Sequence, residues 1–301
     1  TRPVDLHLKA MERLGAQIEL KDGYVEASAP DGLQGGRIRF STVSVGGTEN
    51  ALMAASLAKG TTIISNAARE PEIVDLASCL RAMGALIQGD GGDEITIEGV
   101  GQLGGAIHDV IPDRIEAGTF MLAAVGTRGK LMVEHARAEH LSALMDKLEH
   151  MNVHLEATSQ GVLVDASRDV VKPVDVDTQP HPGFPTDLQA QIMAVLTQVE
   201  GDALLTENIF ENRFMHVPEL LRMGADITLK GSNARVRGVE HLKGAPVMAT
   251  DLRASVSLVM AGLAARGTTI VRRVYHLDRG YEAVEKKLRP CGALIERFSE
   301  D

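Results

Sequence analysis

Two five-residue stretches, Gly60-Thr61-Thr62-Ile63-Ile64 and Gly267-Thr268-Thr269-Ile270-Val271, are nearly identical although they lie in opposite halves of the chain. Similar stretches begin at Gly129 and Gly201. A second phrase, an apolar residue followed by Gly-Ala as in Leu14-Gly15-Ala16 and Met83-Gly84-Ala85, also recurs. Its central residue follows the first glycine of each stretch by 23 to 25 residues. This phrase recurs every 68 to 72 residues, with a degenerate copy at residues 151–153. Because two independent landmarks keep the same period, the chain is predicted to consist of repeated units.

Each repeat has the same local pattern of hydrophobicity. Ala-rich segments at 51–58, 120–125 and 252–265 are apolar on nearly every side, which favours buried helices. A second segment places Ile73, Leu80 and Met83 on one stripe, as in a partly exposed helix. Turn residues at 21–23, 89–92 and 230–233 lie between alternating runs typical of hairpins. We therefore predict an α/β fold of αβαββ units, with helices packed inside and sheets outside.

Repeat counting also predicts the domain organisation. The boundary between two lobes falls near Ile111-Pro112, giving lobes at 1–111 and 112–301. The strand glycine that should precede Gly15 would lie before residue 1, so we expect the chain to begin inside a unit and an N-terminal segment of the same polypeptide to precede it. The last copy is expected to end within its hairpin at Asp301. The alternative is a degenerate first unit, since terminal repeats are often atypical.

Composition excludes several classes of protein. The chain has 31 Lys and Arg against 41 Asp and Glu, a net charge of −10, which argues against general affinity for nucleic acid or anionic membranes. It has no Trp, 6 Phe and 3 Tyr, too few for a stacking surface for bases. The longest apolar stretch, 254–265, is too short to span a membrane. Cys79 and Cys291 show no metal-binding pattern, which favours a reduced, cytoplasmic chain.

Two arginines occupy one position of the repeat. Arg213 follows Gly201 by 12 residues and Arg279 follows Gly267 by 12 residues, so both are predicted in the loop between the short strand and the amphipathic helix. Arg69 is a looser counterpart. Loops at the carboxyl ends of strands face the ligand crevice of α/β proteins, and an arginine there presents a planar fork to carboxylate or phosphate. The two matched arginines therefore predict an anion site.

Two aspartates form a second matched pair. Thr186-Asp187-Leu188-Gln189 and Thr250-Asp251-Leu252-Arg253 each open an Ala-rich helix. Thr186 and Gln189 have capping-box spacing, so spacing alone favours helix-capping roles. The alternative is that a carboxylate beside guanidinium groups removes a proton from a substrate hydroxyl. His7 and His216 are predicted to be structural, or to support the site from behind, rather than to act as catalytic nucleophiles.

The longer motifs resemble a known family. These are residues 2–7 (Arg-Pro-Val-Asp-Leu-His), 184–191 (Phe-Pro-Thr-Asp-Leu-Gln-Ala-Gln), 211–220 (Glu-Asn-Arg-Phe-Met-His-Val-Pro-Glu-Leu), 249–255 (Ala-Thr-Asp-Leu-Arg-Ala-Ser) and 278–282 (Asp-Arg-Gly-Tyr-Glu). They closely resemble motifs of the bacterial UDP-N-acetylglucosamine 1-carboxyvinyltransferases. The resemblance implies a two-lobed inside-out α/β barrel, the enolpyruvyl transferase fold. It also implies transfer of enolpyruvyl from phosphoenolpyruvate to the 3′-hydroxyl of UDP-N-acetylglucosamine, with release of phosphate, in the first committed step of peptidoglycan synthesis and without a cofactor.

The resemblance also implies roles for individual residues. Asp187 would be the general base for the sugar hydroxyl, while Arg2, Arg213 and Arg279 would surround phosphoenolpyruvate. Other polar or lining groups would complete the substrate site: Arg2, Pro3, Val4, Asp5 and Leu6 with Thr42, Val43, Ser44 and Val45 around the uridine diphosphate, Ile209 at the nucleotide, and Asp251, Arg253, Glu70, His7 and Thr186 in or near the cleft.

Two departures from the family pattern affect these expectations. The family's reactive cysteine, or the aspartate that replaces it, would lie just upstream of Thr1, and neither Cys79 nor Cys291 matches it. Thr42 stands where many members have lysine. Two alternatives are a 3-phosphoshikimate 1-carboxyvinyltransferase, which lacks the quoted signatures, and a non-catalytic repeat scaffold, in which arginines would be scattered over the repeats.

Overall fold

The computed structural model describes residues 4–299, and the chain divides into two compact units. The first unit runs to Ile111 and also includes Pro180–Pro182. The second comprises Pro112–Gln179 and the chain from Gly183 onward. The return of 180–182 to the first unit could not be predicted from repeat counting, because it is a three-residue segment within the third repeat.

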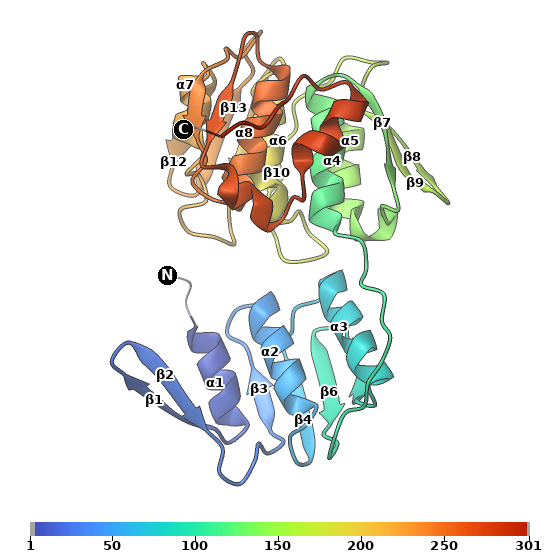
Figure 1. The fold of residues 1–301 in the computed structure, drawn as a ribbon, viewed down its shortest axis with the longest axis vertical. Helices are drawn as coiled ribbons and strands as arrows, with labels where there is room; N and C mark the ends of the chain where they lie inside the picture. Colours follow the sequence, from blue (N-terminus) through green and yellow to red (C-terminus); the bar gives the residue numbers. More distant parts are fainter. Residues whose placement is uncertain (1–3, 300–301) are drawn as a thin grey trace. The chain divides into compact units, whose positions relative to one another are not determined.

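The first unit contains three helices and two sheets among its described residues (Figure 1). Its helices are α1 (Asp5–Arg13), α2 (Val45–Ala55) and α3 (Pro71–Ala82). The hairpin β1 (Gln17–Lys21) and β2 (Tyr24–Ser28) stands alone, and the other sheet has the order β3-β4-β6-β5, from β3 (Arg37–Arg39), β4 (Thr61–Ser65), β5 (Leu86–Gln88) and β6 (Glu94–Glu98). Helix α2 contacts both α1 and α3, and its small side chains Ala51 and Ala55 are fully buried.

Helix α2 is less enclosed than its sequence predicts. Met53 and Leu57, on and just after this helix, are 47% and 52% exposed. Within the described part of this unit, only α1 and α3 pack on α2 as helices, so one side of an all-round apolar helix stays uncovered. The expectation of a fully buried helix at 51–58 is therefore wrong for this unit.

The second unit has three long apolar helices at its centre: α4 (Arg114–Gly126), α6 (Gln189–Leu196) and α8 (Leu252–Ala264). All three pack on one another, and every residue of α6 is buried. The amphipathic helices are α5 (Ser142–His150), α7 (Val217–Arg222) and the short α9 (Val284–Leu288), with 3-10 turns η1 (Ala138–His140), η2 (Thr186–Leu188), η3 (Val274–Arg279) and η4 (Arg289–Cys291). The predicted arrangement of inward helices is confirmed here (Figure 1).

Three sheets of the second unit lie outside these helices. They have the orders β7-β9-β8, β10-β11-β13-β12 and β14-β15, from β7 (Lys130–Glu134), β8 (His154–Thr158), β9 (Gly161–Asp165), β10 (Val176–Asp177), β11 (Asp202–Thr206), β12 (Asp226–Lys230), β13 (Asn233–Arg237), β14 (Pro246–Met248) and β15 (Ile270–Arg272). Strands β11 and β13 have alternating buried and exposed residues, so each sheet turns one face to the helices. The predicted hairpin of the last repeat is not formed, since residues 292–299 contain no strand.

Three repeats contain a strand that the αβαββ pattern lacks. Strands β3, β10 and β14 precede the inward helix and pair in parallel with β4, β11 and β15. These strands have two or three residues, too few for alternation to be recognised in a sequence. The period itself is confirmed by the backbone: Asn66, His135 and Arg273 each follow the short strand and all have φ between 57° and 60°.

Some glycines are required because two segments approach closely. A Cβ on Gly35 would lie 2.4 Å from the carbonyl oxygen of Thr61, and one on Gly244 would lie 2.5 Å from that of Thr268. The two glycines hold equivalent places beside the Gly-Thr-Thr stretches. Any larger residue there would push the short strand away from the preceding segment.

No helix within residues 4–299 is both long enough and apolar enough to cross a membrane.

Candidate active site

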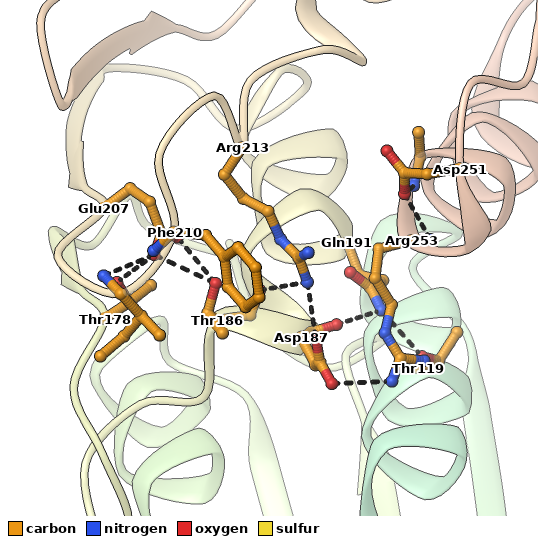
Figure 2. A network of polar contacts seen from close by, with 12 residues as sticks. Thr119, Thr178, Thr186, Asp187, Gln191, Glu207, Phe210, Arg213, Asp251 and Arg253 are labelled. Carbon is orange, nitrogen blue, oxygen red and sulfur yellow. Dashed lines mark hydrogen bonds and ion pairs between the residues drawn. The ribbon is translucent and has the colours of Figure 1, made fainter. Parts of the chain in front are cut away.

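Asp187 lies between two arginine side chains in the second unit (Figure 2). Arg213 donates from Nη2 to Oδ1 of Asp187 at 2.5 Å, and Arg253 donates from Nη2 to Oδ2 at 2.8 Å. Burial alone would raise the pKa of Asp187, but the positive charges and hydrogen bonds of Arg253 and Arg213 outweigh it and hold the pKa below its usual 3.8. The carboxylate is therefore ionised and bound on both oxygens.

The capping box predicted at Thr186 and Gln189 is wrong. Residues 186–188 form the 3-10 turn η2, and α6 begins at Gln189 without a side-chain cap. Thr186 Oγ1 instead donates to the carboxylate of Glu207, and Asp187 binds arginines rather than backbone amides. The side chains are drawn away from the helix because charged partners bind them more strongly than an amide would.

Asp251, the repeat counterpart of Asp187, is a helix cap. Its Oδ1 accepts from the backbone N–H groups of Arg253 at 2.8 Å and Ala254 at 3.0 Å. The capping interpretation is therefore confirmed for Asp251. This cap fixes the first turn of α8 and with it the backbone of Arg253, so Asp251 contributes to the site by positioning a cation.

Arg213 lies in the predicted loop, between β11 and α7. Its guanidinium stacks over the ring of Phe210, with the carbon Cζ 5.0 Å from the ring centre. Its Nε is buried and has no hydrogen-bond partner among residues 4–299. Arg279 ends η3 in the equivalent connection between β15 and α9 and is exposed. The loop assignment of both arginines is confirmed, and the structure brings Arg213, but not Arg279, into contact with Asp187.

Glu207 organises the loop that carries Arg213, and sequence reasoning missed it. Its side chain is 4% exposed, and Oε1 accepts from the backbone N–H groups of Ile209 at 2.9 Å and Phe210 at 3.0 Å. The same carboxylate accepts from the hydroxyls of Thr178 and Thr186. These contacts hold Ile209, which is 41% exposed, and Phe210 at the start of the loop. A single buried glutamate after a strand carries no spacing signal that would have identified it.

His216 is buried directly behind the Arg213 loop. It is 1% exposed, and its Nε2 lies 3.2 Å from the sulfur of Met193. Burial lowers the pKa of His216 from 6.5 to about 4, with the charge of Asp251 opposing and that of Arg213 adding to the effect. The predicted structural role fits a neutral imidazole within an apolar layer.

The buried histidine predicts acid sensitivity. The folded protein resists protonation of His216 down to about pH 4, whereas the unfolded chain takes up the proton near pH 6.5. Stability from the neutral ring is therefore complete above pH 6.5 and is lost as the pH falls towards 4, by about 3 kcal/mol in total. Urea unfolding at pH 7 and pH 4.5 should show a smaller pH effect in His216→Gln than in the wild type. His154→Gln, at an exposed histidine of β8, is the control, and equal pH effects in all three proteins would contradict the prediction.

The site residues predicted in the first unit gather around the beginnings of α1 and α2. Arg2 and Pro3 lie outside the described residues. Val4 and Asp5 are exposed, Leu6 packs against the core, and His7 Nδ1 lies 3.3 Å from Asn50 Nδ2 of α2. A Cβ on Gly46 would lie 3.3 Å from the His7 ring, so the two helix starts are in contact.

The segment 42–45 leads into α2. Thr42 is exposed, Val43 and Val45 pack against the core, and Ser44 caps the helix by accepting from the N–H of Gly47 at 3.1 Å. Glu70 precedes α3 and is 7% exposed, and its Oε1 accepts from the N–H of His181 at 3.4 Å. Within the described chain, no group of three or more His, Cys, Asp or Glu side chains is arranged to hold a metal ion.

Comparison with known proteins identifies the family. The model of the EPSP synthase (3-phosphoshikimate 1-carboxyvinyltransferase) family matches residues 1–288. A UDP-N-acetylglucosamine 1-carboxyvinyltransferase from Cereibacter sphaeroides is 62% identical over 298 residues, which are 99% of this chain and 71% of that protein. The enzyme of the same name from Paracoccus denitrificans is 60% identical over 300 residues, 99% of this chain and 70% of that protein.

Two solved structures agree in fold. The enolpyruvyl transferase NikO from Streptomyces tendae has a TM-score of 0.86 at 28% identity and covers 97% of this chain and 72% of its own. EPSP synthase from Acinetobacter baumannii has a TM-score of 0.75 over 98% of this chain and 72% of its own, and at 21% identity it supports the fold alone. The chain therefore belongs to the enolpyruvyl transferase family and, within it, to the UDP-N-acetylglucosamine 1-carboxyvinyltransferases.

Proposed function

We propose that the chain transfers the enolpyruvyl group of phosphoenolpyruvate to the 3′-hydroxyl of UDP-N-acetylglucosamine and releases phosphate. Relatives at 60% and 62% identity over 99% of the chain support this reaction. The family model is named after the shikimate enzyme, but the solved structure of such an enzyme is only 21% identical. The reaction belongs to peptidoglycan synthesis. The cytoplasmic location expected from the two cysteines stays a prediction.

The contact that carries the site assignment is the Arg213–Asp187–Arg253 cluster. In the addition step, Asp187 takes the hydroxyl proton as the sugar oxygen bonds to C2 of phosphoenolpyruvate, and an acid protonates C3. In the elimination step, C3 loses a proton and the C2–O bond to phosphate breaks, which restores the double bond. The arginines stabilise the negative charge of the donor and of the departing phosphate. Arg2 and the segments 4–7 and 42–45 are proposed to bind the nucleotide.

The ion pairs of Asp187 imply that the donor activates its own base. With both arginines bound to its carboxylate, Asp187 has a lowered pKa and is a weak base. An anionic donor competes for the same guanidinium groups and therefore weakens their hold on Asp187. The pKa of the carboxylate then rises in the ternary complex, where a proton must be taken.

We further propose that the two compact units are the first lobe at 1–111 and the second lobe at 112–301.

The test is phosphate release from phosphoenolpyruvate. It is measured with the 301-residue chain alone and with the expected upstream segment, taken from the Cereibacter sphaeroides relative and supplied as a separate chain. We expect release that requires UDP-N-acetylglucosamine and that shikimate 3-phosphate does not support. Absence of such release in both arms, while the intact relative is active in the same assay, would exclude the proposed reaction.

Replacement of either repeat-matched arginine should weaken donor binding. Arg213→Ala or Arg279→Ala each removes one charge-assisted contact worth about 1.5–3 kcal/mol, so affinity for phosphoenolpyruvate should fall about 10-fold to 100-fold. Isothermal titration calorimetry in the presence of UDP-N-acetylglucosamine measures the affinity for phosphoenolpyruvate. Arg235→Ala, at an exposed arginine of β13 that pairs with Asp202, is the matched control and should bind normally. If both site variants bind as tightly as the control, the anion-site assignment is wrong.

A further inference from the structure

The hydroxyl of Tyr281 joins all three inward helices of the second unit. Tyr281 follows η3 and is 1% exposed. Its Oη lies 2.8 Å from Oγ1 of Thr119 on α4 and 3.5 Å from Nε2 of Gln191 on α6. The guanidinium of Arg253 on α8 lies close enough to this hydroxyl for its positive charge to oppose the effect of burial on the pKa of Tyr281. One buried oxygen therefore contacts a polar group of every inward helix.

The hydrogen atoms available determine the direction of these bonds. Thr119 has one hydroxyl hydrogen, which it donates to the backbone oxygen of Ile115 at 2.8 Å. Tyr281 must therefore donate its own hydrogen to Thr119 Oγ1. The lone pairs of the tyrosine oxygen are left for Arg253 and Gln191, both of which can only donate through their nitrogens. Gln191 Nε2 uses one hydrogen for the backbone oxygen of Asp187 and shares the other between Tyr281 Oη and Thr119 Oγ1, which lies at 3.3 Å. Burial raises the pKa of Tyr281, so its hydroxyl stays neutral and the direction of the bonds is kept.

The groups that Tyr281 holds are those that hold Asp187. Arg253 donates to Asp187 Oδ2 at 2.8 Å, and Gln191 Nε2 donates to the backbone oxygen of Asp187 at 2.7 Å. Tyr281 therefore contacts Arg253, which binds the carboxylate of Asp187, and Gln191, which binds the backbone of Asp187. Figure 2 shows Asp187 and Arg253 beside Gln191 and Thr119.

We propose that Tyr281 is a positioning residue, whose hydroxyl anchors Arg253 and Gln191 and so fixes Asp187 between its two arginines. The functional importance of that position rests on the proposed function. The ring of Tyr281 has a separate role, because it packs with Val256, Leu277 and Val284 in a small apolar cluster. The hydroxyl, rather than the ring, is therefore the part assigned to the site.

Tyr281→Phe separates the two roles, since it keeps the ring and removes Oη. The carboxyl carbon of Asp187, in a chain labelled with ¹³C-aspartate, is followed by NMR through an acid titration, and Asp187→Asn identifies its signal. The charges that act on Asp187 are those of Arg253 and Arg213, while Asp251 and Glu207 are engaged by backbone N–H groups. Loosening Arg253 should raise the pKa of Asp187 by about 0.5 to 1 pH unit.

Tyr275→Phe is the matched control. Tyr275 lies in η3, is 55% exposed, and accepts hydrogen bonds from Arg273 at 3.1 and 2.7 Å. The Tyr275→Phe variant therefore loses the same kind of arginine–tyrosine contact, but away from Asp187. The titration of Asp187 in this variant should match that in the wild type. A pKa of Asp187 in Tyr281→Phe within about 0.2 pH unit of the control would overturn the proposal.

A second pair of variants keeps the test valid if Tyr281→Phe does not fold. Thr119→Val removes the acceptor for the tyrosine hydrogen, so the hydroxyl turns and its lone pairs leave Arg253. The pKa of Asp187 should rise again, and Thr119→Ser, which retains the hydroxyl, should restore the wild-type value. An unchanged value in Thr119→Val would also overturn the proposal. The titration needs no substrate, so failure of phosphate release would overturn the proposed function without affecting this result.

Discussion

Asp187→Asn is expected to lower the turnover of phosphoenolpyruvate and UDP-N-acetylglucosamine by about 100-fold to 10,000-fold, the contribution of a general base. Affinity for phosphoenolpyruvate should be kept or increase, because the amide no longer competes with the donor for Arg213 and Arg253. The expected result is therefore a loss in kcat without an increase in KM. Turnover is measured in the phosphate-release assay and affinity by calorimetry.

The stability of the same variant distinguishes this site from a helix cap. Asparagine is a good cap but a poor partner for two cations, so the melting temperature should fall by a few degrees and recover when phosphate is added. Asp202→Asn is the control, because Asp202 also lies within 3.4 Å of two arginines, Arg235 and Arg237, on an outer sheet. Normal turnover in Asp187→Asn, or an equal loss in Asp202→Asn, would contradict the assignment.

Glu207→Ala should produce the largest loss of stability among these variants. The change leaves the N–H groups of Ile209 and Phe210 and the hydroxyls of Thr178 and Thr186 without their acceptor. Each buried donor left without an acceptor costs about 1–3 kcal/mol, and water will hydrate some of these donors. The free energy of unfolding should therefore fall by about 3 kcal/mol or more. Urea unfolding measures this change.

Glu207→Gln is the matched control for that variant. Four of the five hydrogen bonds go to Oε1, so an amide oxygen in that place keeps most of the network. The free energy of unfolding of Glu207→Gln should fall by only about 1 kcal/mol. Donor affinity should also fall in Glu207→Ala alone, because the loop that bears Phe210 and Arg213 is no longer held. Equal stability of the alanine and glutamine variants would show that the carboxylate does not organise the loop.

The repeats allowed much of the fold to be predicted from the sequence. Gly60 and Gly267 recur because each takes up a backbone conformation with positive φ, 94° and 92°, at the entry to a short strand, so the landmark has a conformational cause. Strands β3, β10 and β14 could not be predicted, since pairing with the next strand, and not local alternation, defines them. The exposure of Met53 depends on which helices pack on α2, which is a property of tertiary structure.

The site was predictable only in part. Arg213 and Asp187 were identified because the repeat places similar residues at equivalent positions and the family motifs contain them. Spacing favoured the cap for Asp187 and Asp251 alike, and the structure separates them through their partners: arginines for Asp187, backbone amides for Asp251. Glu207 and Tyr281 were missed, because a buried acceptor is recognised by the donors around it, which come from distant parts of the chain.

The three inward helices of the second unit also have an electrostatic consequence. Thr119 and Gln191, and likewise Asp187 and Arg253, are in contact at or within the first two turns of α4, α6 and α8, so the three helices begin at one end of the unit. Their dipoles add there, and each contributes partial positive charge at its N-terminus. The backbone of a chain whose net charge is −10 thus contributes local positive charge that favours an approaching anionic donor. Part of that potential comes from backbone peptide groups, which no change of pH can titrate, so attraction of the donor should persist over the whole pH range in which the helices remain folded.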